Sequence, residues 1–310
     1  MKTVFFGSPS AALPSLRALI DAGHSVELVV TQPDKPAGRG RKLVPSAVKI
    51  FALERHIPVI EPARIRTDEE ALGRVRAAGP DINVVVAYGQ IIPNAVHSFP
   101  PHRSLNVHFS LLPKYRGAAP VQWAVLNGDA ESGVTIIELD DRMDEGDILA
   151  SERVPVGFRE TARELETRLA VLGAKLLLGT LARIDSVVRV KQDDARATLA
   201  PKIKKEDGRI LWEEAASAVD RRVRALADRP GAYTFFKGRR IGILRGENLE
   251  TASAGQAPGT VLAVGKEGLL VACGGGTAFL IEEIQPEGKG PMKAYVFSLG
   301  TRIIPGDTLG

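Results

Sequence analysis

An amide and an imidazole lie two residues apart near the middle of the chain. Asn106 and His108 belong to an apolar run that ends at Ser110. If that run is a β-strand, both side chains project from one face near its carboxyl end, because successive side chains alternate between faces. An amide can donate to a developing oxyanion and an imidazole carries a titratable proton, so the pair suits acyl transfer. The spacing therefore indicates an enzyme.

A cluster of carboxylates follows a later predicted strand. Residues 140–147 include Asp144, and three interpretations of the cluster compete. A calcium loop is disfavoured because Met143 and Leu149 occupy positions that need oxygen ligands. An ordinary solvated turn explains most acidic clusters. The third interpretation is a carboxylate that orients or protonates His108, as carboxylate–histidine pairs do in acyl transfer. The sequence alone does not place Asp144 beside His108.

A basic segment, residues 31–45, is rich in proline and glycine, and we predict an irregular loop there. It holds four lysine or arginine residues and a single acidic residue, Asp34. Such a loop is suited to clamping a phosphate backbone. A solvated flexible loop explains the same composition equally well. The bases are Lys35, Arg39, Arg41 and Lys42.

The elements that must position these groups alternate in type over the first 150 residues. Short β-branched runs alternate with amphipathic stretches, which predicts βαβ units and a doubly wound, mostly parallel α/β sheet. Ligands of such sheets bind beyond the carboxyl ends of the strands. That edge should hold Gly7, Tyr88, Gly89 and residues 106–110. The predicted strands are 3–6, 26–31, 84–87, 105–109 and 133–139, and the predicted helices are 10–22, 46–55 and 68–78.

The second half of the chain changes character twice. Residues 161–184 predict a long helix with a leucine stripe, which core packing explains best. A polar stretch at 189–208 is predicted as a linker. After a further helix at 215–226, glycine-punctuated runs predict a small β-barrel domain. Its strands are expected at 233–236, 240–244, 259–264, 269–273 and 278–284. We therefore expect two domains, residues 1–188 and 209–310.

Composition narrows the class of protein. The 310 residues are 44% hydrophobic, which is ample for a core, and the formal charge is +4. The single cysteine, Cys273, excludes an internal disulfide and fits a reducing compartment. No apolar run approaches the roughly 20 residues that span a bilayer. We expect a cytoplasmic protein without a membrane or metal partner, and nothing demands more than a monomer.

Several motifs taken together resemble the folate-dependent formyltransferases. They are Asn106-x-His108, the run Ser-Leu-Leu-Pro-Lys-Tyr-Arg-Gly at 110–117, and Asp144-x-Gly146-Asp147. Residues 84–93 also match. The segment 32–42 is similar to an insertion that tRNA-formylating members place against the acceptor arm of initiator tRNA. The resemblance covers nearly the whole chain.

The resemblance implies a Rossmann-like catalytic domain followed by an OB-like tRNA-binding domain. It further implies formyl transfer from 10-formyltetrahydrofolate to the amine of methionyl initiator tRNA, without a metal. The catalytic residues would be Asn106, His108 and Asp144, and tRNA would bind the lysine and arginine residues of the 31–45 loop. Folate would lie against Tyr88, Gly89, Ser110, Leu111, Leu112 and Pro113.

Three other functions are weighed against this one. A formyltransferase acting on an amino sugar nucleotide would share the three catalytic residues but would not need the basic loop. A tRNA-binding protein that has lost its activity would not need the intact trio. A nucleotide-binding regulatory protein would carry a glycine-rich phosphate motif after its first strand, and neither common motif occurs there. The basic loop therefore favours tRNA as the acceptor.

Overall fold

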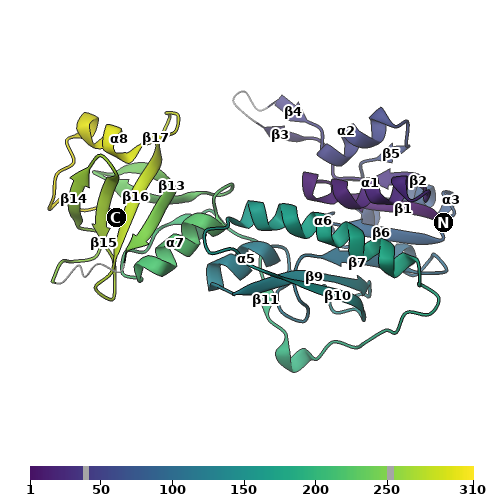
Figure 1. The fold of residues 1–310 in the computed structure, drawn as a ribbon. Helices are drawn as coiled ribbons and strands as arrows, with labels where there is room; N and C mark the ends of the chain where they lie inside the picture. The colour runs from purple at the N-terminus through teal and green to yellow at the C-terminus, as the bar shows by residue number, and fades with distance from the viewer. Residues whose placement is uncertain (38–41, 250–254) are drawn as a thin grey trace. The chain divides into compact units, whose positions relative to one another are not determined.

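The N-terminal half of the chain is built round one seven-stranded sheet (Figure 1). The computed structural model describes residues 1–37, 42–249 and 255–310. The chain divides into two compact units. The first comprises residues 1–120, 131–155 and 166–201, and the second comprises residues 121–130, 156–165 and 202–310.

The seven-stranded sheet is mostly parallel. In spatial order its strands are β10 (Ile148–Pro155), β9 (Glu131–Glu138), β7 (Ser104–His108), β6 (Ile82–Val86), β1 (Lys2–Gly7), β2 (Ser25–Val30) and β5 (Val59–Ile60). The five strands from β7 to β5 run parallel, and β9 is antiparallel to both of its neighbours. This confirms the predicted doubly wound α/β class. Strand order reverses beside β1, so a topological switch point lies at the carboxyl ends of β1 and β6.

Strand β1 is covered on both faces, as a central parallel strand must be. Val4 and Phe6 pack into one buried cluster together with side chains of α3, and Phe5, which points the other way, is equally buried. This two-sided burial explains why β1 is an unbroken apolar run rather than an alternating one. The α-helices described between residues 1 and 181 are α1 (Leu13–Asp21), α2 (Ala47–Glu54), α3 (Glu69–Ala77), α4 (Asn94–His97), α5 (Pro120–Asn127) and α6 (Ala162–Leu181).

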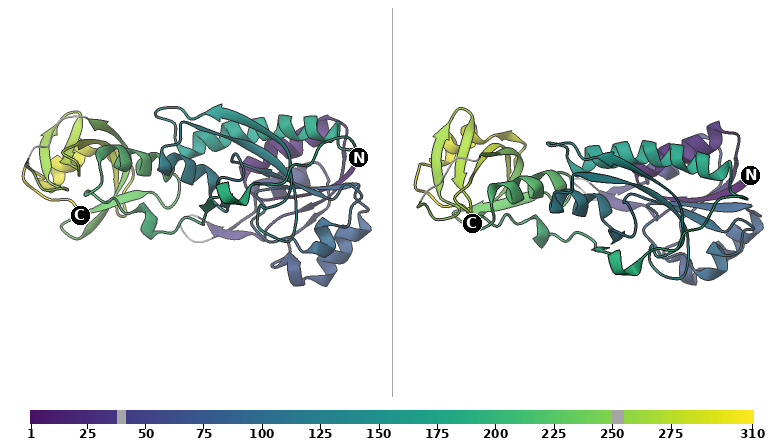
Figure 2. Two further views of the ribbon diagram at one scale, coloured as in Figure 1. Left: turned by 90° about the horizontal axis from the view of Figure 1, so that it is seen from below. Right: turned by 60° about the horizontal axis from the view of Figure 1, so that its bottom comes forward.

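Helix α6 runs along the sheet beside β7 and β9 (Figures 1 and 2). Its backbone approaches these strands closely at Gly173, where a Cβ atom would lie 2.7 Å from Cγ1 of Val107. Leu165, Leu169 and Leu177 are fully buried, so most of the predicted leucine stripe packs in the core. Because Val107 faces α6, its neighbours Asn106 and His108 must face the opposite side of the sheet.

The second unit contains an antiparallel sheet with the order β12-β13-β16-β15-β14, and β17 also pairs with β16. Figure 2 shows these strands, coloured green to yellow, curling round on themselves. Five strands lie where the sequence predicts them, which confirms the predicted second fold. The elements are α7 (Ala216–Ala225), β12 (Ala232–Phe236), β13 (Arg239–Leu249), β14 (Val261–Gly265), β15 (Gly268–Ala272), β16 (Ala278–Pro286), β17 (Met292–Lys293) and α8 (Ala294–Thr301).

Two segments differ from their predicted structure. The basic segment is not wholly irregular, because β3 (Lys35–Ala37) and β4 (Lys42–Val44) pair as an antiparallel hairpin. A short, exposed two-stranded sheet tolerates a proline. The composition of the segment therefore did not reveal that it forms strands. The first part of the predicted linker also forms structure: β11 (Leu199–Ala200) pairs in parallel with β8 (Arg116–Gly117), and Val190 bridges to Ile148.

Nowhere in residues 1–37, 42–249 and 255–310 is there a helix both long and apolar enough to cross a membrane.

Cys273 is expected to be unreactive in the folded protein. The thiol is buried in the core of the second unit, and this burial raises its pKa to about 12 from an ordinary 9.0. At about pH 8 the thiolate fraction of Cys273 should therefore be about a thousandfold smaller than that of a thiol with the ordinary pKa. The thiolate is the species that reacts. Titration with Ellman's reagent should detect no thiol in the native protein and one thiol per chain in denaturant. Rapid labelling of the native protein would contradict this burial.

Candidate active site

Strand β7 presents an amide and an imidazole at the carboxyl edge of the sheet. Asn106 and His108 lie on the same face and are only 9% and 6% exposed. Asn106 is paired with Val85 of parallel β6, and His108 with Thr135 of antiparallel β9. Both side chains are therefore held on a central strand rather than on a loop, and such placement keeps functional groups well positioned.

The carboxylate of Asp144 completes the site. Its Oδ1 accepts a hydrogen bond from Nδ2 of Asn106 at 3.2 Å, and its Oδ2 accepts one from the backbone N–H of Gly117 at 2.9 Å. The same Oδ2 lies 3.7 Å from Nδ1 of His108. The structure thus gathers the three residues that the sequence left apart. The carboxylate side chain is 14% exposed, so it interacts with the imidazole in surroundings that screen charge weakly.

Asp144 lies on the Asp144 loop, residues 139–147, which joins β9 to β10. The loop closes where the N–H of Glu138 donates to the carbonyl of Asp147 at 2.9 Å. A Cβ atom at Gly146 would lie 1.7 Å from the carbonyl oxygen of Glu138, so only glycine fits there. Asp144 itself has a φ of 56°, a left-handed conformation that costs about 1–2 kcal/mol for a residue with a side chain. Contacts with other residues must therefore hold Asp144 in this conformation.

The imidazole of His108 has a defined orientation. Its Nε2 lies 2.9 Å from the carbonyl oxygen of Tyr115. A carbonyl only accepts hydrogen bonds, so Nε2 carries a proton and donates it. Nδ1 is then the nitrogen that can gain or lose a proton, and it faces Asp144. This arrangement suits proton exchange at Nδ1 with a group bound beside the carboxylate.

The predicted folate-binding turns follow neighbouring parallel strands. Tyr88 and Gly89 come directly after β6, and residues 110–113 come after β7, so both turns lie at the carboxyl edge of the sheet. Tyr88 is fully buried against the ring of Phe6, and this burial raises the pKa of its hydroxyl. Its carbonyl accepts a hydrogen bond from Nε2 of Gln32 at 2.6 Å.

Thr135 supports the turn at residues 110–113, and the sequence pattern did not single it out. Its hydroxyl donates to the carbonyl of Ser110 at 2.7 Å and accepts from the N–H of Leu112 at 3.1 Å. It thereby fixes the turn that carries the predicted folate contacts. A fully buried threonine inside the apolar run of β9 is the one available signal, because a buried hydroxyl needs partners.

The basic residues are only partly described. Lys35 and Lys42 lie at the two ends of the β3–β4 hairpin and are exposed. The ammonium of Lys35 donates to Oε1 of Gln32. Arg39 and Arg41 lie outside the described residues. Within those residues no three histidine, cysteine or acidic side chains gather as a metal site would require.

An amide, an imidazole and a carboxylate gathered at the carboxyl edge of a doubly wound sheet supply the oxyanion donors and the proton carrier that an acyl-transferring enzyme needs. Family comparison agrees. The formyl transferase family matches residues 1–181, and the formyl transferase C-terminal domain matches residues 202–302. The chain belongs to the formyl transferase family.

Similar proteins with curated names match the whole chain. The methionyl-tRNA formyltransferase of Geobacter sulfurreducens is 44% identical over 314 residues, which cover 100% of this chain and 97% of that protein. The methionyl-tRNA formyltransferase of Thiobacillus denitrificans is also 44% identical, over 310 residues and 100% of both chains.

Solved structures share the fold at lower identity. An N-formyltransferase from Helicobacter canadensis, in complex with folinic acid and dTDP-3-aminofucose, is 19% identical with a TM-score of 0.67, covering 92% of this chain and 99% of that one. HypX from Aquifex aeolicus, in complex with tetrahydrofolic acid, is 18% identical with a TM-score of 0.64. That match covers 96% of this chain and 47% of HypX, so the chain spans about half of its length.

Proposed function

We propose that this protein transfers the formyl group of 10-formyltetrahydrofolate to the α-amino group of methionine carried by initiator tRNA, a reaction of translation initiation. The full-length similarity to methionyl-tRNA formyltransferases supports the choice of substrates. The observation that carries the chemistry is the Asp144 carboxylate, which is hydrogen-bonded to Asn106 and faces His108. The basic segment, residues 31–45, favours tRNA over an amino sugar nucleotide as the acceptor.

The reaction is a direct transfer. The neutral amine attacks the formyl carbon, a carbon–nitrogen bond forms, and the carbonyl oxygen becomes an oxyanion. The bond from the formyl carbon to the folate nitrogen then breaks. The amine gives up one proton, and the folate nitrogen takes one up. No covalent bond to the protein is required, so the protein's tasks are to orient the reactants, stabilise the oxyanion and move one proton.

Each member of the trio has a task that its geometry suits. The amide nitrogen of Asn106 carries two N–H donors and directs one to Asp144, so the second is proposed to bind the oxyanion. Protonated His108 is the second proposed oxyanion donor and moves the proton through Nδ1. The carboxylate of Asp144 lies 3.7 Å from Nδ1 of His108, and its proposed task is to keep the imidazole in this orientation.

The turn at residues 110–113 and the Tyr88–Gly89 turn are proposed to hold the folate. The N–H of Leu112 and the carbonyl of Ser110 are already bonded to Thr135. These two groups therefore shape the turn, and the pterin edge would bind other backbone groups of the turns. For the tRNA we propose contacts to Lys35, Arg39, Arg41 and Lys42, together with the second unit.

The proposal is tested by supplying 10-formyltetrahydrofolate with methionylated initiator tRNA and measuring formyl-methionyl-tRNA. Methionylated elongator tRNA is the control, and formylation should be confined to the initiator. Because phosphate contacts release counterions, the tRNA affinity should fall about tenfold or more between about 50 and 200 mM salt. Absence of product from a folded protein would overturn the proposal, and amino sugar nucleotides would then be the next acceptors to test.

A further inference from the structure

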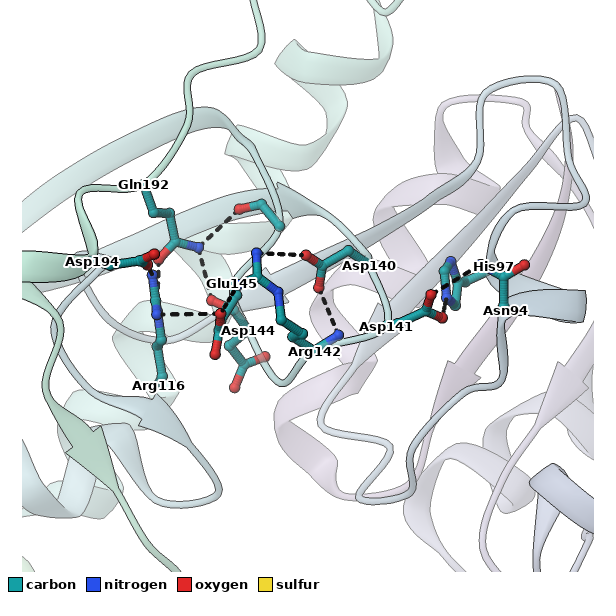
Figure 3. Close-up of polar contacts among 11 residues, drawn as sticks. Asn94, His97, Arg116, Asp140, Asp141, Arg142, Asp144, Glu145, Gln192 and Asp194 are labelled. Carbon is teal, nitrogen blue, oxygen red and sulfur yellow. Dashed lines mark hydrogen bonds and ion pairs between the residues drawn. The ribbon is translucent and has the colours of Figure 1, made fainter.

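Gln192 joins the Asp144 loop to a distant part of the chain (Figure 3). Its Nε2 lies 2.8 Å from the carbonyl oxygen of Asp144 and 2.8 Å from that of Gly146. An amide nitrogen carries two N–H groups, so both carbonyls can be satisfied at once. Asp144 and Gly146 flank the turn of the loop, and Asp144 is the residue held in the left-handed conformation.

The orientation of Gln192 follows from its other partner. Its Oε1 accepts a hydrogen bond from Nε of Arg116 at 3.0 Å. A guanidinium only donates, so the amide oxygen must face Arg116 and the amide nitrogen must face the loop. Arg116 is 6% exposed and also donates from Nη2 to Asp194 at 2.7 Å. That hydrogen bond lowers the pKa of the Asp194 carboxyl.

Arg116 and the residues beside it connect Gln192 to the side chain of Asp144 as well as to its backbone. Arg116 is followed in the chain by Gly117, whose N–H donates to the Asp144 side chain. The strap, residues 192–200, runs beside both: the N–H of Arg116 donates to the carbonyl of Thr198 at 2.8 Å. A Cβ atom at Gly117 would lie 2.7 Å from the carbonyl oxygen of Ala200, so the strap approaches too closely for any other residue. The strap thus fixes both the side chain and the backbone of Asp144.

The opposite end of the loop has a more exposed anchor. Asp141 accepts hydrogen bonds from Nδ2 of Asn94 at 3.4 Å and lies 3.1 Å from Nε2 of His97 (Figure 3). The His97 side chain is buried, but the Asp141 side chain is 71% exposed, so solvent screens the charge of the carboxylate. The anchor at Gln192 is more shielded and lies on the catalytic residue itself.

We infer that Gln192 is a positioning residue, which fixes the backbone of Asp144 and so keeps its carboxylate at His108. It lies in the stretch predicted as a linker, and it touches no reacting atom. Its effect on turnover rests on the proposed function, whereas its effect on the loop can be measured without any activity.

The variant Q192E separates the two links that Gln192 makes. One oxygen of a glutamate still accepts from Arg116, so the strap stays attached. The other oxygen replaces the amide nitrogen and faces two carbonyl oxygens, and neither side can donate a hydrogen bond. Hydrogen exchange should show the Gly117 amide exchanging at least about tenfold faster than in the wild type. The variant Q90E is the matched control: Gln90 also bridges backbone groups, at Pro62 and Ile65, away from the Asp144 loop. It should leave exchange at Gly117 unchanged.

Kinetics provide the second readout. Because small displacements of a catalytic group are costly, Q192E should lower kcat by about 10- to 100-fold while KM for both substrates stays within about twofold. In a D144N background Q192E should have no further effect beyond about twofold, because residues acting through one another are not additive. Unchanged exchange at Gly117, unchanged kcat, or equal losses in both backgrounds would each overturn the inference. A wild-type protein without transferase activity would instead refute the proposed function, and the exchange experiment would still decide the role of Gln192 in the loop.

Discussion

Replacing His108 by alanine is expected to lower kcat for formyl transfer by about 10³–10⁴-fold. The change removes both an oxyanion donor and the group that moves the proton, and each is worth about 10²-fold or more. The binding constants for folate and for tRNA should change little, because the imidazole lies at the reacting centre and not in the proposed tRNA contacts. Single-turnover kinetics with methionylated initiator tRNA, at saturating folate, measure the effect.

Two further variants make the His108 prediction specific. H108Q can still donate to the carbonyl of Tyr115 but holds no titratable proton, so it should fold normally and remain inactive. H102A is the control, since His102 is paired with the exposed Asp185 at 3.7 Å and lies outside the site. It should keep kcat within about twofold. A variant H108Q with wild-type turnover would show that the imidazole neither donates to the oxyanion nor moves the proton.

Asp144→Asn is expected to lower kcat by about 10²–10³-fold. In the wild type both carboxylate oxygens accept, one from Asn106 and the other from Gly117. An asparagine offers a single oxygen, so one of these N–H groups would face another donor. The substitution also removes the negative charge that faces Nδ1 of His108. Circular dichroism and thermal unfolding should show that the fold is retained.

The neighbouring carboxylate of Asp140 supplies a matched control for Asp144. It accepts from the N–H of Arg142 at 2.9 Å and lies in the same acidic cluster. D140N removes the same charge without touching the trio, so kcat should stay within about threefold. Equal losses in D140N and D144N would mean that the net charge of the loop matters, and that the position of Asp144 does not.

The sequence by itself determined the local part of the site. Asn106 and His108 share a face because side chains alternate along any strand, and that rule needs no tertiary information. The same reasoning identified the parallel sheet, the buried leucine stripe of α6 and the short antiparallel strands of the second unit. In each case the repeat of apolar residues and the placement of glycine set the structure over a few residues.

The family resemblance named Asp144, but only the tertiary structure shows which distant groups contact that pair. Asp144 reaches Asn106 across 38 residues, and Gln192 reaches Asp144 across 48. Neither contact is encoded in a local period, because each depends on how β9 pairs with β7 and how the strap returns along β8. For the same reason the composition of the strap, which is polar and charged, predicted a linker. A hydrogen bond to one backbone carbonyl requires only a single amide at the right place, and nothing in the surrounding sequence marks that amide as different from a solvated one.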